Sequence, residues 1–317
     1  MALTLFLKEK DTMKYSGIGG QAILEGVMMR NRDRYALSCR RADGEIVIRE
    51  HQVEREIARP FKNIPFVRGF FAFLDSLVMG IKVLNESSDI YLQEESGENE
   101  KSTGAASTLI TVLSFALGLV LAFALFTVLP SFLASLFPGI THHYTLRAIL
   151  EGIGRLIIFL AYLVLISRMK DIQRVFQYHG AEHKSINCVE SNMPLDVEHV
   201  RLCPTAHKRC GTSFLFFVVI VSIIVGLFIR VDTLWLRILI RLLLLPVVSG
   251  ISYEILRAAG TSEAAWIRIL SAPGLLCQRL TVKEPDDSMI ECAIASVNAV
   301  FDWRKWQDEN FGDHDAS

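Results

Sequence analysis

The sequence predicts a mainly α-helical, polytopic membrane protein with about four transmembrane helices, an amphipathic membrane-associated helix and a small N-terminal β element. Three observations predict this class. Hydrophobic residues make up 51% of the 317-residue chain, and the mean hydropathy is +0.35. Several apolar runs approach or exceed the roughly 20 residues that cross a bilayer core. Lysine and arginine are also distributed unevenly among the segments between those runs, as is typical of membrane proteins.

The overall charge argues against one class of partner. The formal net charge is −1, so no strong positive field favours nucleic acid, and the lipid bilayer is the expected partner. Six cysteines are scattered without the dense spacing of a disulfide framework, so those facing the cytosol are expected to be reduced. The opening stretch MALTLFLKEK does not resemble a cleaved signal peptide, and we expect it to be retained.

Residues 1–63 are expected to form a cytosolic N-terminal segment with a β-hairpin. The stretch YALSCRRADGEIVIREHQV has two β-rich arms around Asp43-Gly44, a dipeptide that favours a tight hairpin turn. The preceding stretch GIGGQAILEGVMMR lacks the Lys-Ser/Thr pair that ends a phosphate-binding loop. Its glycines are therefore interpreted as allowing close backbone packing.

Residues 64–86 predict an amphipathic helix. Arg68, Asp75 and Lys82 recur every seven residues and form one narrow polar stripe on an otherwise apolar surface. Such a helix suits the membrane interface or the flank of a bundle, and a buried helix of a soluble domain is the alternative. Residues 87–106 are acidic and rich in serine and glycine, which predicts a linker.

Four apolar runs are expected to cross the bilayer: 107–129, 147–167, 213–230 and 235–257. Each should be helical because lipid cannot satisfy backbone polar groups, and the short connections pair the runs into two transmembrane hairpins, 107–167 and 213–257. Pro130 is expected to end the first run. Glu151 and Arg155, four positions apart, are expected to form an internal ion pair.

The distribution of basic residues predicts the orientation. Segments 131–146 and 231–234 contain no lysine or arginine, whereas the loop 168–212 contains seven and both tails contain more. We therefore expect the N-terminal segment, this loop and the C-terminal tail 258–317 to be cytosolic. Three arginines lie near the expected outer ends of spans and so oppose this distribution of basic residues: Arg230, Arg237 and Arg241. Their long side chains can extend to the membrane interface.

The middle loop contains the stretch FQYHGAEHKSI, in which His179 and His183 are four residues apart. On a helix this spacing places both imidazoles on one face, where they can bind one ion. Glu182 completes the order H-x-x-E-H that inverted zincin proteases use, with the glutamate as base. Two histidines in a basic loop are also common as solvated surface residues, so that interpretation is kept beside the metal site.

The stretch CPTAHKRCGTSF strengthens the metal hypothesis by adding Cys203, His207 and Cys210 before the third apolar run. A zinc site needs four nitrogen or sulfur donors when it is structural, and three plus a water when it is catalytic. The expected ligand set is His179, His183, His207 and Cys210. Cys203 is an alternative ligand, and His199 and Cys188 of the same loop leave the assignment open.

Glu254 in GISYEILR lies near the cytosolic end of the fourth run, where an unpaired carboxylate is costly. It could bind the ion, orient a ligand histidine, or pair with Arg257 one turn on. The last two roles are favoured. The nitrogen and sulfur donors favour Zn²⁺ over hard oxygen-seeking ions, and another transition metal is the alternative.

Five blocks of the sequence together resemble a known family, and they occur in that family's order: GGQAILEGVMMR, FQYHGAEHKSI, HKRCGTSF, ISYEILR and PGLLCQRLTVKEPDD. The chain resembles the YqhQ-like bacterial membrane proteins from about Gly19 to Val300. That family has no known function, and its members are described as predicted metal-dependent enzymes.

The resemblance implies a multi-pass protein of the bacterial inner membrane. It also implies that five residues occupy the family's polar motif positions: His179, Glu182, His183, His207 and Cys210. Lys208 stands where relatives tend to have proline. This departure should not disturb metal binding, because proline donates no side-chain ligand.

Two functions from different classes fit these features. The first is a metal-dependent hydrolase, with Glu182 as catalytic base, acting on a lipid or a membrane protein at the cytosolic boundary. The second is a scaffold, or an assembly or quality-control factor for other membrane proteins, with a structural metal. A transporter fits less well, because two helical hairpins are few for a pore. Substrate, reaction and oligomeric state are left open.

Overall fold

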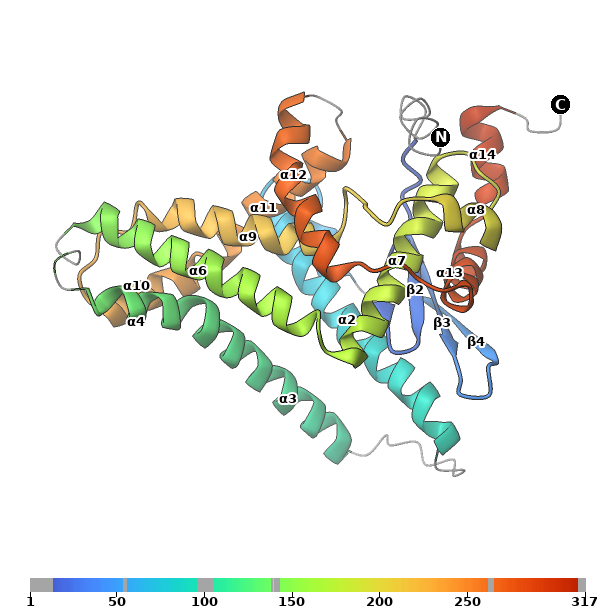
Figure 1. The fold of residues 1–317 in the computed structure, drawn as a ribbon, viewed down its shortest axis with the longest axis horizontal. Coiled ribbons are helices and arrows are strands. Elements are labelled where there is room, and N and C mark those ends of the chain that lie inside the picture. The colour runs from blue at the N-terminus through green and yellow to red at the C-terminus, as the bar shows by residue number, and fades with distance from the viewer. Residues whose placement is uncertain are drawn as a thin grey trace.

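The computed structural model describes residues 14–53, 56–95, 105–137, 139, 143–261 and 265–312. Helices predominate in these ranges, and one small antiparallel sheet lies near the N-terminus. The expected class, mainly α-helical with a small N-terminal β element, is therefore confirmed. Figure 1 shows the sheet and its covering helices at one end of the molecule and the long apolar helices at the other.

The sheet is a four-stranded antiparallel meander in the order β1-β2-β3-β4. Its strands are β1 (Gly19–Ile23), β2 (Gly26–Asn31), β3 (Arg34–Arg40) and β4 (Ile46–Gln52). The hairpin expected around Asp43-Gly44 is the β3–β4 pair. The glycine-rich stretch before it, for which the sequence predicts close backbone packing, forms β1 and β2.

The two faces of the sheet pack against different helices. One face, which includes Val27 and Met29, lies in a core with α7 (Lys170–Glu190) and α13 (Asp287–Val300). The other face, which includes Met28 and Leu37, packs against Val83 and Ile90 of α2 (Val67–Glu95). Successive strand residues point to opposite faces, so this alternation fixes which helix covers which side.

Helix α2 links the sheet to the apolar helices. The expected polar stripe makes three specific contacts: Arg68 pairs with Glu254, Asp75 accepts backbone N–H groups from residues 57 and 58, and Lys82 lies over the Tyr35 ring. Arg68 thus ties the start of α2 to α11 (Leu245–Thr261), while Asp75 and Lys82 contact the N-terminal segment. The helix continues to Glu95, so its last nine residues lie in the range expected to be a linker.

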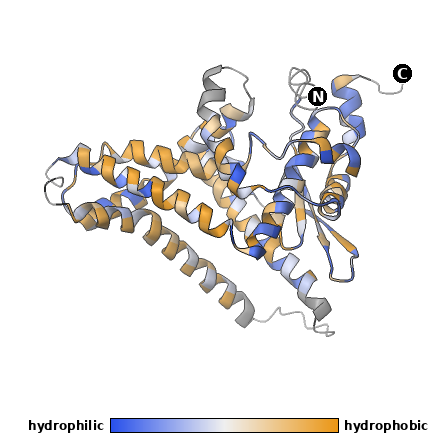
Figure 2. Cartoon of the chain, viewed as in Figure 1, coloured by the Kyte–Doolittle hydropathy of each residue, from blue (hydrophilic) through white to orange (hydrophobic). Residues whose placement is uncertain are grey.

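Two helices of the described chain are long and apolar enough to cross a membrane, Leu109–Ser135 and Tyr144–Ile166 (α6). A third candidate is formed if α10 (Leu234–Leu243) and α11 (Leu245–Thr261), which meet at a 48° bend, count as one span. Helix α9 (Gly211–Gly226) has 16 residues and is about 24 Å long, shorter than a bilayer core of about 30 Å. The structure thus supports two or three of the four expected spans. Figure 2 shows that hydrophobic residues dominate the end of the molecule that these helices form.

Pro130 does not end the first apolar helix, contrary to expectation. Helix α3 (Ala105–Phe123) continues through a π-helical turn (Ala124–Val128) into α4 (Leu129–Ser135). Proline has no N–H to give to the carbonyl of Phe126 four residues earlier. Arg155 of α6 supplies the missing donor, with Nε 2.8 Å from that carbonyl oxygen.

The expected ion pair between Glu151 and Arg155 is replaced by other partners. Glu151 pairs with Arg237 and Arg241 of α10. Arg155 instead donates to Phe126 and to Ser222 of α9. The acidic group therefore joins two helices rather than bracing one.

The segment 258–317, expected to be a tail, contains three helices: α12 (Ala265–Thr281), α13 and α14 (Trp303–Phe311). Helix α13 is part of the core beneath the sheet. The remaining short elements are a 3₁₀ turn (Arg59–Phe61) and α8 (Val197–Leu202). All six cysteines are free thiols.

Candidate metal centre

Helix α7 presents two histidines toward a buried site. His179 and His183 are one helical turn apart, and their ring centroids are 4.4 Å apart. The spacing predicted from the sequence therefore holds, because residues four apart share a helix face. His183 is buried at 1% exposure, while the side chain of His179 is 16% exposed and forms the more accessible side of the site.

Cys210 provides the third donor. It is the N-cap residue of α9, and its Sγ lies 3.3 Å from Nε2 of His179. The sulfur also accepts the backbone N–H of Thr212 at 3.4 Å. His179, His183 and Cys210 each offer a ligand atom, and these atoms all lie within 4.8 Å of one another. We call these three residues the His-His-Cys group.

Backbone carbonyls orient both imidazoles. Nδ1 of His179 is 3.1 Å from the carbonyl oxygen of Thr281, and Nδ1 of His183 is 2.5 Å from that of Thr205. An imidazole whose Nδ1–H donates to a carbonyl keeps the lone pair of Nε2 for a metal, which is the usual arrangement around metal-binding histidines. The two rings are thus held in the tautomer that suits a cation.

Glu182 lies beside this group with part of its carboxylate unsatisfied. It is 5% exposed, and its Oε2 has no hydrogen-bond partner among the described residues. That oxygen is 3.9 Å from Nε2 of His179. Burial raises the pKa of Glu182, while His179 and a hydrogen bond from the Gly20 backbone oppose the rise. A cation held by the His-His-Cys group would stabilise the buried carboxylate.

His207, expected as the fourth ligand, lies next to the group but is not part of it. Its ring centroid is 5.3 Å from that of His183. Its Nε2 is 3.3 Å from Arg209, and Gln278 holds its backbone through both N–H and C=O. Burial lowers the pKa of His207 well below the usual range, which leaves the ring neutral.

Two further candidates are placed elsewhere. Cys203 is buried in the core beneath the sheet, and its sulfur contacts Met193 and the carbonyl of His199. Glu254 is bound by Arg68 through two hydrogen bonds of 2.7 and 2.5 Å. The expected role of Glu254 in orienting a ligand histidine is therefore not observed, because its carboxylate already has a different partner.

The structure also identifies supporting residues that the sequence did not single out as functional. Thr205 and Thr281 orient the histidines through their backbones, Gln278 fixes the loop around His207, and Gly20 contacts Glu182. Backbone carbonyls have no sequence signature. Gly20 and Gln278 do lie in the blocks GGQAILEGVMMR and PGLLCQRLTVKEPDD. These blocks carry the family resemblance, so the resemblance could have indicated both residues.

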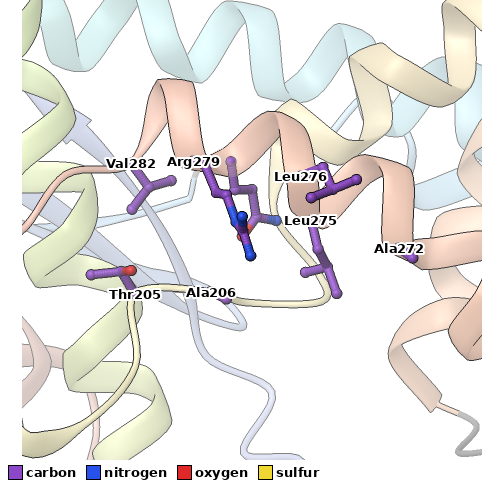
Figure 3. A pocket seen from close by; sticks show the side chains of 8 residues that line it. Thr205, Ala206, Ala272, Leu275, Leu276, Arg279 and Val282 are labelled. Carbon is purple, nitrogen blue, oxygen red and sulfur yellow. The ribbon is translucent and has the colours of Figure 1, made fainter.

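A cavity of about 400 Å³ lies beside the carbonyl that orients His183. It is formed by the loop at residues 205–206 and one face of α12, and its lining is apolar apart from a few polar groups. Figure 3 shows the Arg279 side chain extending from α12 toward the loop that carries Thr205 and Ala206. The lining residues are Thr205, Ala206, Ala272, Leu275, Leu276, Gln278, Arg279 and Val282.

Taken together, these features define a mainly helical protein with membrane-type apolar helices and a buried His-His-Cys group suited to a transition metal. Residues 64–303 match the family described as "Protein of unknown function (DUF1385)", and the chain belongs to that family. It is similar to "Uncharacterized protein YqhQ" of Bacillus subtilis (strain 168), with 39% identity over 303 residues that cover 92% of this chain and 94% of the relative. The resemblance to YqhQ-like proteins is thus confirmed. No solved structure matches the chain.

Proposed function

We propose that this chain is a metal-dependent hydrolase of the bacterial cell membrane, with zinc at a cytosolic site beside the bilayer. The observation that carries this proposal is the composition of the site. Three nitrogen and sulfur donors converge, and a buried carboxylate oxygen next to them has no hydrogen-bond partner among the described residues. Three protein ligands beside an acid–base residue are typical of catalytic zinc sites, whereas structural sites use four.

The membrane setting is inferred from the apolar helices and the charge distribution. The most apolar window of Leu109–Ser135 contains no buried residue, as expected for a helix that faces lipid. We infer four spans with both termini cytosolic: the helices 109–135 and 144–166, α9 extended by its apolar flanking residues, and the bent pair α10 and α11. The short α9 would require a local thinning of the bilayer.

The residues of the site divide into those that bind and those that move a proton. His179, His183 and Cys210 would hold the ion, with the two imidazoles oriented by the backbone carbonyls. A zinc ion bound there would supply Lewis acidity, which lowers the pKa of water to about 7. Glu182 would accept the proton from the attacking water, because a carboxylate beside a cation is ionised at neutral pH.

The surroundings favour a substrate that belongs to the membrane. The cavity beside the site is lined by Leu275 and Leu276, of which Leu276 is 56% exposed, and by the cationic side chain of Arg279. An apolar wall with one cation fits a lipid or a membrane-protein segment better than a small polar metabolite.

A second function is favoured by one specific observation. The ring of His207 is 5.3 Å from that of His183, so this neighbouring imidazole would be the fourth donor if it turned toward the ion. A closed four-ligand site that includes a thiolate is typical of structural zinc. The protein would then be a scaffold, or an assembly or quality-control factor for other membrane proteins.

One comparison separates the two functions. Glu182→Gln should retain the metal but abolish hydrolysis. When it is expressed in a strain that lacks the gene, it should fail to restore the wild-type phenotype. Glu198→Gln, which changes an acidic residue of α8 outside the site, is the matched control and should behave as wild type. Full complementation by Glu182→Gln with normal metal content would reject catalysis and favour the scaffold. Absence of metal from protein expressed in zinc-replete medium would reject both.

A further inference from the structure

A cluster of charged residues lies within the apolar helices, at the end of the bundle away from α7. It consists of Arg147, Glu151, Arg155, Arg237 and Arg241, and we call it the arginine cluster. Three members are four residues apart on α6 and two are four apart on α10, so each helix presents one charged face. Figure 1 shows α10 at the end of the bundle where α6 begins.

The cluster is buried and its positive charge is not balanced. Arg147, Glu151 and Arg237 are 5%, 1% and 3% exposed. Glu151 is the acidic member; it pairs with Arg237 and Arg241, while the cluster contains four guanidinium groups in all. Asp232, which accepts the hydroxyl of Tyr144 at 2.8 Å, lies exposed at the rim and contributes one further negative charge. Counted over the described residues of this region, four guanidinium groups stand beside two carboxylates, so the arginines outnumber the acidic groups where buried charge is costly.

Not all of the guanidinium donors are satisfied. Arg147 donates to the carbonyl of Val231, and Arg155 donates to Phe126 and Ser222. Arg237 differs, because its Nε and Nη1 are buried and have no hydrogen-bond partner in the described part of the chain. Its Nη1 lies 3.0 Å from Glu151 as an ion pair without hydrogen-bond geometry. Nε of Arg241 is also without a partner there.

We propose that the arginine cluster binds the phosphate of an anionic lipid head group, with Arg237 as the principal donor. Buried guanidinium donors beside an excess of positive charge are suited to an oxyanion, and arginine is well matched to phosphate. The site is separate from the His-His-Cys group and does not depend on the function proposed for it.

The surface of α10 favours a lipid over a soluble anion. Trp235 at its start is 74% exposed, and tryptophan is enriched at membrane interfaces, where lipid phosphates lie. Arg237 follows two residues later. The outer face of the same helix exposes Leu239 and Leu243 at 49% and 68%, which acyl chains could cover. A free phosphate would use the arginines but gain nothing from this apolar face.

Two irregularities of the backbone adjoin the cluster. The π-helical turn Ala124–Val128 gives the carbonyl of Phe126 to Arg155, and α10 meets α11 at a 48° bend. Irregular helices within a membrane domain are tolerated where they are buried in protein or line a polar site, and π-turns are frequent at functional sites. Their position around the same arginines agrees with a binding site.

The test uses full-length protein purified in detergent. The apparent midpoint of thermal unfolding is measured with added phosphatidylglycerol, phosphatidylcholine or inorganic phosphate in separate arms. We expect phosphatidylglycerol to raise the midpoint by about 2–4 °C and the other two to leave it unchanged. Arg237→Gln should remove the rise. Arg230→Gln, which alters an exposed arginine at the same end of the bundle, should preserve it.

An equal response to phosphatidylcholine, a response to inorganic phosphate alone, or an unchanged response in Arg237→Gln would overturn the proposal. If Arg237→Gln does not fold, a second measurement on the wild-type protein tests whether the arginine cluster binds a lipid. About one phospholipid phosphate per chain should remain after exhaustive washing in detergent, as counted by phosphorus analysis and lipid mass spectrometry. Loss of all lipid together with no rise in the midpoint would likewise reject the site.

Discussion

The backbone of Gly20 lies directly against the side chain of Glu182. A Cβ added to Gly20 would be 3.1 Å from Cγ of Glu182 and 2.5 Å from the carbonyl oxygen of Met28. The glycine thus brings strand β1 close enough for its N–H to bind the carboxylate. This contact ties the N-terminal sheet to the candidate metal centre and gives the first prediction.

Gly20→Ala should destabilise the protein and disturb the metal centre. The added methyl group has to displace β2 or push Glu182 away, and overpacking of this kind costs about 1–3 kcal/mol. Gly19→Ala is the matched control, because a Cβ there meets no atom within 4 Å. Thermal unfolding and metal content measure the difference. Equal behaviour of the two variants would contradict the contact.

Removal of the metal should change the reactivity of one cysteine selectively. With zinc bound, Cys210 should resist alkylation, and after chelation it should react before Cys39. Burial raises the pKa of Cys39 to about 12, so at pH 8 its thiolate fraction is about 10⁻⁴. Because the thiolate is the reactive form, alkylation of Cys39 should remain slow until the sheet unfolds or the pH approaches that value. Mass spectrometry of labelled peptides measures both sites.

If Cys210 reacted at the same rate with and without zinc, it would not be a ligand. Cys203→Ser provides a control, since that thiol lies in the core beneath the sheet and its loss should leave the zinc-dependent protection of Cys210 unchanged.

Pro130 and Arg155 should be energetically coupled. Arg155→Gln leaves the carbonyl of Phe126 without its donor, which should cost about 1–3 kcal/mol. In a Pro130→Ala background the new N–H can serve that carbonyl, so the same arginine substitution should cost less. A double-mutant cycle on unfolding free energies measures the coupling. Additive effects would show that the arginine does not replace the missing donor.

Glu254→Gln should lower stability without changing the metal content. Its carboxylate binds Arg68 and the backbone N–H of Phe66, which fixes the start of α2 to α11. Loss of charge-assisted hydrogen bonds of this kind costs about 1–3 kcal/mol. Elemental analysis compared with His183→Ala, which should lose the metal, tests the assignment. A fall in metal content in Glu254→Gln would restore its role near the histidines.

The sequence predicted that the two histidines share one helix face, because that placement depends on local spacing. His179 and His183 share a face through helical periodicity alone, and Cys210 precedes an apolar run that marks its helix. The sequence did not predict the partner of Glu254, because Arg68 is 186 positions away and no local pattern records such a contact. The orienting carbonyls escape prediction for the same reason, since any residue type supplies one.

The fold was predictable where hydrophobic periodicity was strong. The sequence does not predict the β1–β2 pair, because glycine is depleted in strands and the β1 stretch GGQAI has little β propensity, although it pairs with β2 throughout. The prediction that Pro130 ends its helix is wrong because a distant arginine compensates for the hydrogen bond that proline cannot make. In both cases a tertiary contact overrides a local rule.

The dependence of His179 on the carbonyl of Thr281 has a consequence for biosynthesis. A ribosome that has translated both histidines and Cys210 must still add about seventy residues before the group that orients the first imidazole exists. Nascent or truncated chains that stop before α12 therefore carry all three candidate ligands but lack the carbonyl that orients His179. An ion that binds this group would meet a fully oriented site only after the carboxyl-terminal region has been made and has docked.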